Sequence, residues 1–293
     1  MSQFNSHQRG VLITVIGVLI LTPDALLVRL VEMDHWTLLF WRTLFAGFSF
    51  FTLNSFIENS SPIKAISGLF KNGLFTTLMF GGSNICFVIS ITHTVVANTL
   101  VILASMPFIA AVLTVGLMRK NLELRTWITI FLAMAGIAVV FWGRFGDGNT
   151  FGDIFAILCA LFMAAALVTV SLNPKINTTA ALGLGSFLTA LFSLYMGADL
   201  TAPSPRDFVY LFLNGGIIIP IALGLIAYGP KLISAPEVSL IMLLETVLGP
   251  YWVWLVLSER LPLQTFVGGA LVVTAILVNA WLGYKSERST APV

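Results

Sequence analysis

The sequence predicts an all-α, polytopic membrane protein of ten transmembrane helices, built as two inverted five-helix repeats around a central cavity. Three observations predict this fold class. First, 58% of the 293 residues are hydrophobic and only 10% are charged, whereas a soluble domain carries about a quarter charged residues. Second, the hydrophobic residues form blocks of about 20, the length of a helix that crosses about 30 Å of hydrocarbon. Third, the two halves of the chain are weakly similar to each other.

Short polar breaks separate the hydrophobic blocks. They carry turn residues, as in ENSSP, NPKINTT and ADLTAPSPRD. Every connection is short, so the chain leaves no room for a soluble domain. A membrane β-barrel is excluded because the blocks are about twice as long as a barrel strand and do not alternate. The ten predicted helices cover residues 11–31, 36–57, 70–92, 95–117, 124–143, 151–172, 178–198, 207–228, 235–257 and 262–283.

Basic residues gather on one predicted side of the membrane, and their excess marks the cytoplasmic side. With the N-terminus inside, the outer side holds Arg144, Arg206 and Arg260. The inner side holds Arg9, Lys64, Lys71, Arg119, Lys120, Arg125, Lys175, Lys231, Lys285 and Arg288. We therefore expect a multi-pass protein of the cytoplasmic (inner) membrane with both termini in the cytoplasm.

Composition and motifs also limit the function. The net charge of +2 is small and scattered, so nucleic acid is not an expected partner. Cys86 and Cys159 lie inside hydrophobic blocks and are expected to be small buried hydrophobes. The sequence contains no HExxH, CxxC or P-loop motif, and its histidines lack the spacing of metal ligands. We expect no metal, no cofactor and no enzymatic activity.

The internal repeat predicts how the two halves are related. A shift of 139 positions places residues 89–127 on residues 228–266. Hydropathy and turn positions then agree, although identity is weak. Each half holds five predicted helices, and an odd number makes the second half enter the membrane inverted. Inverted repeats are typical of secondary transporters, which bind substrate near the membrane midplane between the halves. The predicted repeats are residues 1–143 and 144–293.

Three local motifs are FWRTLFAG around Arg42, SMPFIAAVLTVGLMRKNL around Pro107 and LLETVLGPYWVWLVLSERLPLQTFVGGALVV. Together they resemble the EamA-like family of the drug/metabolite transporter (DMT) superfamily. In that family a Glu-Pro pair, a later Glu, a Gln and a Gly recur in the last two helices. The corresponding residues here are Glu245, Glu259, Gln264 and Gly268.

The resemblance implies a central cavity and alternating access, but it is a poor guide to the substrate. The family is known for exporting amino acids, drugs and varied metabolites. This chain departs from the motif at Thr246, which replaces the proline, and Pro250 follows a turn later, where we expect a kink. We therefore expect a secondary transporter that exports a small metabolite or an amino-acid-like or drug-like solute. Protons are one candidate coupling ion, and the oligomeric state is left open.

Three ionisable residues lie deep in the predicted helices: Asp24, Arg42 and Glu245. A charge at mid-helix costs roughly 2.5–3.5 kcal/mol on insertion scales, so such residues mostly face a bundle interior or a wet cavity. At about 1.5 Å per residue, Asp24 and Arg42 share a level on adjacent helices, and Glu245 lies near the midplane. Two interpretations stay open. The groups either hold helices together, as an Asp24–Arg42 pair and a protonated Glu245, or line the cavity and bind an amine or a proton.

Polar and aromatic residues complete the predicted site. Asn84 and Asn214 have glycine neighbours that let backbones approach closely. A deep tryptophan would wall a pocket for a cationic or ring-bearing substrate, although packing against lipid is the alternative. The predicted cavity residues are Asp24, Arg42, Asn84, Asn214, Tyr228, Glu245, Trp252 and Trp254.

Two other function classes were weighed against transport. An integral-membrane enzyme acting on a lipid-linked substrate needs clustered polar groups at one interface, and the sequence shows none. A non-transporting membrane scaffold needs no carboxylate at the midplane, so Glu245 argues against it.

Overall fold

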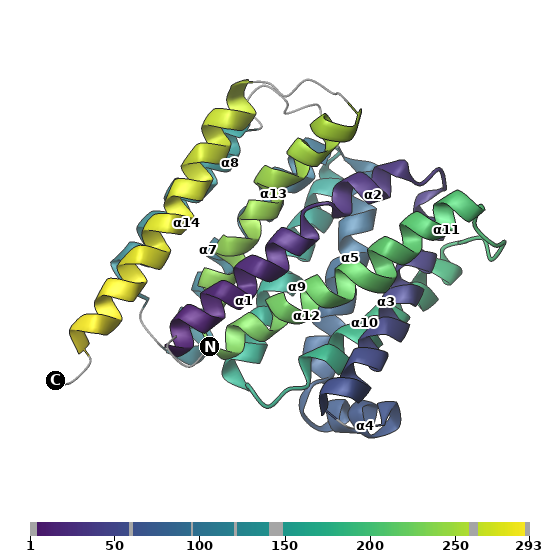
Figure 1. Ribbon diagram of the computed structural model, residues 1–293, viewed down its shortest axis with the longest axis horizontal. Helices are drawn as coiled ribbons and strands as arrows, with labels where there is room; N and C mark the ends of the chain where they lie inside the picture. Colours follow the sequence, from purple (N-terminus) through teal and green to yellow (C-terminus); the bar gives the residue numbers. More distant parts are fainter. Residues whose placement is uncertain are drawn as a thin grey trace.

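The computed structural model is a bundle of helices (Figure 1). It describes residues 5–58, 61–94, 96–119, 122–140, 149–257 and 263–290, and Glu259 lies outside these ranges. The elements, all helical, are α1 (Ser6–Leu21), α2 (Asp24–Leu30), α3 (His35–Glu58), α4 (Pro62–Asn72), α5 (Leu74–His93), α6 (Val96–Leu103), α7 (Met106–Met118), α8 (Leu124–Val140), α9 (Thr150–Leu172), α10 (Thr178–Tyr195), α11 (Pro205–Leu211), η1 (Phe212–Ile218), α12 (Ile219–Tyr228), η2 (Gly229–Lys231), α13 (Ala235–Leu257) and α14 (Leu263–Thr290).

Several helices are long and apolar enough to cross a membrane. Within the described ranges there are six such stretches, or seven if the bent pair α4–α5 forms one span. They are Ser6–Leu30, Asn98–Leu117, Thr150–Leu172, Thr178–Tyr195, Pro205–Lys231 and Ala235–Val256. Shorter apolar helices cover Leu124–Val140 and Phe266–Ala280. The all-helical, polytopic character agrees with the sequence, and the count of ten spans stays a prediction.

Prolines break two of the predicted helices in mid-span. The segment 11–31 is α1 and α2, separated at Thr22 and Pro23. Proline has no backbone N–H to donate to the preceding turn, and its ring crowds that turn. The segment 95–117 is likewise α6 and α7, with Pro107 in the first turn of α7, where a missing N–H is tolerated. In contrast, α13 continues through Pro250 as one helix.

The predicted helix 207–228 is continuous but changes its pitch. Between α11 and α12, residues Phe212–Ile218 form the π-helical element η1, in which the N–H of Ile219 bonds to the carbonyl of Asn214, five residues back. Pro220 begins the next turn without an N–H of its own. Widened turns of this kind often occur at functional sites.

The short helix α4 was not predicted. Ser61 caps it, because its hydroxyl accepts a hydrogen bond from the backbone N–H of Lys64 at 3.4 Å, and Pro62 occupies the first helical position. At Gly73 the chain turns by 99° into α5. A helix of 11 residues is too short to be recognised as a span.

The most extensive packing joins the first part of the chain to the second. The main pairs are α5 with α9, α3 with α10, α8 with α14, α1 with α12 and α7 with α13. Small residues allow close approach between membrane helices. A Cβ atom on Gly136 of α8, for example, would lie only 2.9 Å from the carbonyl oxygen of Gly268 on α14.

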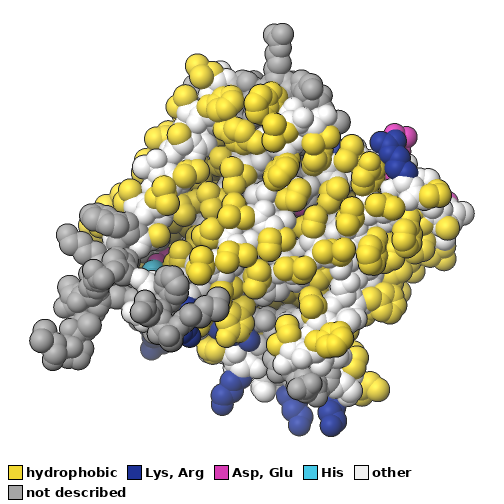
Figure 2. All heavy atoms as spheres, in the orientation of Figure 1, with side chains coloured by type: hydrophobic (Ala, Val, Ile, Leu, Met, Phe, Trp, Pro, Cys, Tyr) yellow, Lys and Arg dark blue, Asp and Glu magenta, His cyan; other side chains and the backbone are white. Residues whose placement is uncertain are grey.

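The surface matches a protein surrounded by lipid. Figure 2 shows hydrophobic side chains over most of the visible face, with most of the visible Lys and Arg side chains at the lower end, where α4 lies in Figure 1. Exposed apolar side chains of this extent are typical of a surface that contacts other apolar matter. Phe56 and Leu124, for example, are 78% and 74% exposed.

Candidate functional site

Asp24, Arg42 and Asn214 form a closed hydrogen-bonded triad. The Nη2 of Arg42 donates to both carboxylate oxygens of Asp24, at 2.8 and 3.0 Å. The Nε of Arg42 donates to the Oδ1 of Asn214 at 3.0 Å, and the Nδ2 of Asn214 donates to the Oδ1 of Asp24 at 2.8 Å. Each side chain is therefore bonded to the other two, and the triad joins α2, α3 and η1.

Local backbone features bring these three side chains together. Asp24 is the first residue of α2, just after the break at Pro23, where the helix dipole favours a carboxylate. Asn214 is presented by the π-helical turn. Gly215, next in sequence, lets η1 approach α3 closely, because a Cβ there would collide with the carbonyl of Arg42.

The triad is largely buried. The side chains of Arg42 and Asp24 are 17% and 15% exposed, and Asn214 is 2% exposed. Removing one partner of such a pair leaves a buried charge without compensation, which is strongly unfavourable. Arg42 and Asn214 also line a narrow crevice with apolar residues of α2, α3 and α11.

Glu245 lies beside the triad but is not bonded to it. It interacts electrostatically with Asp24 and Arg42, yet within the described ranges no hydrogen bond or ion pair joins its carboxylate to another residue. Its helix, α13, packs against α1, α2, α7, α8, α9 and α14. Glu245 is therefore a partly exposed carboxylate enclosed by protein on several sides, the surroundings expected of a functional group inside a membrane.

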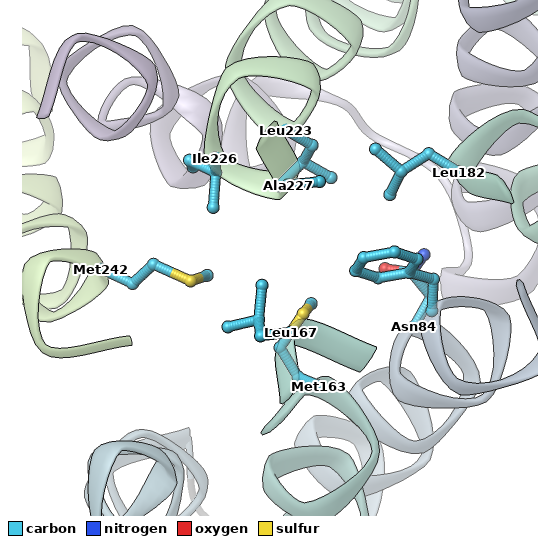
Figure 3. A pocket seen from close by; sticks show the side chains of 9 residues that line it. Asn84, Met163, Leu167, Leu182, Leu223, Ile226, Ala227 and Met242 are labelled. Carbon is cyan, nitrogen blue, oxygen red and sulfur yellow. The ribbon is translucent and has the colours of Figure 1, made fainter. Parts of the chain in front are cut away.

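A small, mostly apolar cavity lies one helical turn from Glu245 along α13 (Figure 3). The centre of a water molecule can move within about 10 Å³ of this cavity, so the cavity has room for about one water. Among the described residues that line it, Asn84 is the only one with a polar side chain. Figure 3 shows the labelled side chains converging from different helices. The lining residues are Phe80, Asn84, Met163, Leu167, Leu182, Leu223, Ile226, Ala227 and Met242.

The predicted aromatic residues Tyr228, Trp252 and Trp254 are not among the residues that line this cavity. The indole N–H of Trp252 donates to the hydroxyl of Thr22 at 2.9 Å, which ties α13 to the break between α1 and α2. Trp254 and Tyr228 are each 43% exposed. The Nζ of Lys231 lies 5.4 Å from the centre of the Tyr228 ring. The structure therefore groups Asp24, Arg42, Asn214 and Glu245, places Asn84 at the cavity, and puts Tyr228 and Trp254 in neither group.

Two polar contacts at helix N-termini were not predicted. At the start of α13, Glu237 contacts the Nε2 of His7 on α1 at 3.1 Å and accepts a hydrogen bond from the hydroxyl of Ser234 at 2.8 Å. At the start of α9, Asp153 accepts one from the hydroxyl of Thr94 at 2.7 Å. Each acid sits in a first helical turn, a position that the helix dipole favours, but the partners could not be found from sequence because they lie 59 and 230 positions away.

The model of the EamA-like transporter family matches the chain twice, over residues 8–142 and 150–281. The chain belongs to the EamA-like transporter family. The family expected from the motifs around Arg42, Pro107 and Glu245 is therefore confirmed. No curated protein matches the sequence.

The fold of this EamA-like protein is also found among solved structures. One, titled "Crystal structure of protein", superposes with a TM-score of 0.77 at 14% identity, and the match covers 93% of this chain and 98% of that chain. At this identity the likeness concerns the fold alone. EamA membership and the apolar helices together make the protein a multi-pass membrane transporter of the DMT type, and proteins of this family are generally transporters rather than enzymes.

Proposed function

We propose that the protein is a secondary transporter that exports a small, amine-bearing metabolite by alternating access. The observation that carries this proposal is Glu245, a carboxylate beside the triad and one turn from the cavity. Among the described residues it has no hydrogen-bond or ion-pair partner. Neither a membrane scaffold nor an enzyme of lipid-linked substrates gives a reason for an acidic group at this place.

The charges of the cluster indicate what would bind there. Arg42 already donates two hydrogen bonds to Asp24, so these two charges offset each other. An ionised Glu245 leaves one net negative charge inside the membrane, which is unfavourable without a partner. An ammonium group or a proton supplies the missing positive charge. Amines, amino acids and cationic drugs carry such a group, and a proton that competes with them at Glu245 would couple transport to a proton gradient.

Two inverted repeats are the second part of the proposal, supported by contacts that recur in both halves. Near the start of α1, a Cβ on Gly10 would lie 2.6 Å from the Cγ2 of Ile233. Near the start of α9, a Cβ on Gly152 would lie 2.7 Å from the Cβ of Thr94. Thr94 and Ile233 are separated by the same 139 positions that relate the halves in sequence.

The direction of the last helix in each half supports the inversion. Thr129 of α8 donates a hydrogen bond to Asn279 of α14, while Gly136, farther along α8, faces Gly268, earlier in α14. The two helices therefore run antiparallel. Equivalent helices of two repeats run antiparallel when the repeats enter the membrane in opposite senses.

Alternating access requires a closure at each end of the cavity, and the two polar contacts are suited to this role. The His7–Glu237 contact lies where α1 and α13 begin. The hydroxyl of Ser171, near the end of α9, donates to the carbonyl of Pro230, near this same place. The start of α9, with the Thr94–Asp153 contact, therefore lies at the opposite end of the molecule. In this proposal the structure, with both contacts made and room for about one water, is assigned to an occluded state.

The proposed orientation puts both termini in the cytoplasm of a cytoplasmic (inner) membrane. It rests on the gathering of Lys and Arg side chains at the end of the molecule near the N-terminus (Figures 1 and 2). In this orientation the His7–Glu237 contact closes the cavity toward the cytoplasm, and the Thr94–Asp153 contact closes it toward the outside.

Counterflow in reconstituted vesicles tests the function. Vesicles preloaded with one member of a panel of amines and amino acids should accumulate the labelled form of an accepted solute. Glu245→Gln should abolish counterflow at every pH while the protein stays folded. Glu32→Gln removes a carboxylate that is 82% exposed and serves as the matched control, which should transport normally. No counterflow across the whole panel, or normal transport by Glu245→Gln at several pH values, would overturn the proposal.

A further inference from the structure

The helix α4 lies across the end of the bundle rather than along it. Its axis makes an angle of 99° with that of α5, and Figure 1 shows it at the lower end of the molecule, beneath α3 and α10. When α5 crosses a membrane, α4 therefore runs nearly parallel to the membrane plane. Amphipathic helices in this position lie at the boundary between headgroups and acyl chains.

The side chains of α4 divide into three faces. Ala65 and Leu69 are 7% and 2% exposed and pack against the bundle. Ile63 and Phe70 are 80% and 65% exposed on a second face. The third face carries two exposed lysines, Lys64 and Lys71. At about 100° per residue, the three faces point roughly 100–130° apart.

The second face is suited to acyl chains. Phe56 and Ile57, at the end of α3, are 78% and 68% exposed, and α3 contacts α4. Together with Ile63 and Phe70 they give this end of the molecule four large apolar side chains with little protein against them. Such side chains are stable when the acyl boundary of a bilayer covers them.

The third face is suited to anionic headgroups. Among the described residues, no carboxylate forms an ion pair with Lys64 or Lys71. The lysines are seven positions apart, two helical turns, so both ammonium groups point the same way. Clustered lysines on an amphipathic helix attract anionic lipids.

We propose that α4 is an interfacial helix that binds anionic phospholipid, with Ile63 and Phe70 in the acyl boundary and Lys64 and Lys71 on the phosphate groups. The alternative, in which α4 is the first half of a broken span, would put both lysines in hydrocarbon, where charge is strongly disfavoured. The proposal rests on the membrane location of the protein and not on its transport activity.

Spin labels on the full-length protein in lipid vesicles test the position of the helix. In a background of Cys86→Ala and Cys159→Ala, labels at Ile63→Cys and Phe70→Cys should be relaxed more by oxygen, which dissolves in the bilayer, than by an aqueous nickel chelate. A label at Gly68→Cys, where a Cβ would have nothing within 4 Å, should show the reverse. The proposal is overturned if all three labels are relaxed more by the nickel chelate than by oxygen, or if all three are relaxed more by oxygen.

Lipid affinity tests the role of the lysines. Binding of phosphatidylglycerol and phosphatidylcholine to the full-length protein in detergent is measured by native mass spectrometry. A basic residue at an anionic surface contributes about fivefold in affinity, so Lys64→Gln/Lys71→Gln should weaken phosphatidylglycerol binding at least about fivefold and leave phosphatidylcholine unchanged. The control Arg119→Gln/Arg206→Gln removes the same charge at exposed positions at the end of α7 and the start of α11, and it should have a smaller effect. Equal losses in the two double variants, or equal affinity of the unchanged protein for both lipids, would contradict a specific site on α4.

Discussion

Removing Arg42 should destabilise the protein more than removing Asp24, and removing both should cost least. In Arg42→Gln, Asp24 and Glu245 lose the cation with which both interact. A lone charge inside the membrane costs roughly 2.5–3.5 kcal/mol, and the remaining hydrogen bond from Asn214 to Asp24 returns about 0.6 kcal/mol. The expected loss of unfolding free energy is therefore about 2–3 kcal/mol.

Asp24→Asn should be milder because Glu245 already interacts electrostatically with Arg42 and can replace Asp24 as its anion. In the double variant Asp24→Asn/Arg42→Gln, amide groups replace both charges, and the loss should stay within about 1 kcal/mol. The free energies are measured by reversible unfolding in mixed micelles, followed by tryptophan fluorescence. A double variant that loses the sum of the single losses would refute this reasoning, because independent sites are additive. An Asp24→Asn variant that is less stable than Arg42→Gln would refute the part assigned to Glu245.

Two further predictions concern packing and gating. Gly136→Leu should push α8 from α14 and lower the free energy of unfolding by about 1–3 kcal/mol. The control is Gly116→Leu, where a Cβ would have nothing within 4 Å, and it should change the free energy of unfolding by less than about 0.5 kcal/mol. Equal losses in the two variants would contradict the contact between α8 and α14. With a cysteine introduced at Met163 in the cavity, His7→Ala should speed its reaction with a membrane-impermeant thiol reagent added on the side of the N-terminus. Asp153→Ala, which removes the acceptor of the Thr94 hydroxyl, should do so from the other side. Unchanged rates in both variants would show that these contacts do not close the cavity.

The sequence predicted that Asp24 and Arg42 share a level, and it left open whether they form a pair. Asp24 and Arg42 lie on consecutive helices joined by a short turn, so the rise per residue alone sets them at one level. The structure places them 2.8 Å apart. Asn214 was recognised as a polar residue inside a helix, but its bonds to both partners depend on the π-helical turn, whose hydrogen-bond register is not encoded in any periodic pattern.

The remaining differences have local causes. Pro23 and Pro107 are visible in the sequence, yet a proline in a membrane helix is common and does not show whether the helix kinks or breaks. The apolar pattern of α4 is short and interrupted by lysines, so it was taken for a connection. Trp252 and Trp254 were chosen for their depth along a helix, and depth does not tell which side of the helix faces the cavity. Tyr228 was chosen as a polar residue at the end of the predicted helix 207–228.

The wide turn η1 also gives the eighth predicted span a second possible register. A π-helical turn holds one more residue than the same stretch of α-helix, so residues 212–218 contain one extra residue. If this stretch returned to α-helical pitch, the extra residue would shift to another turn of the helix, and α11 would rotate against α12 by about 100°. Asn214 would then turn away from both charged partners, while the helix kept its own backbone hydrogen bonds. The pair of Asp24 and Arg42 would thus lose its hydrogen bonds to Asn214 without any helix unfolding.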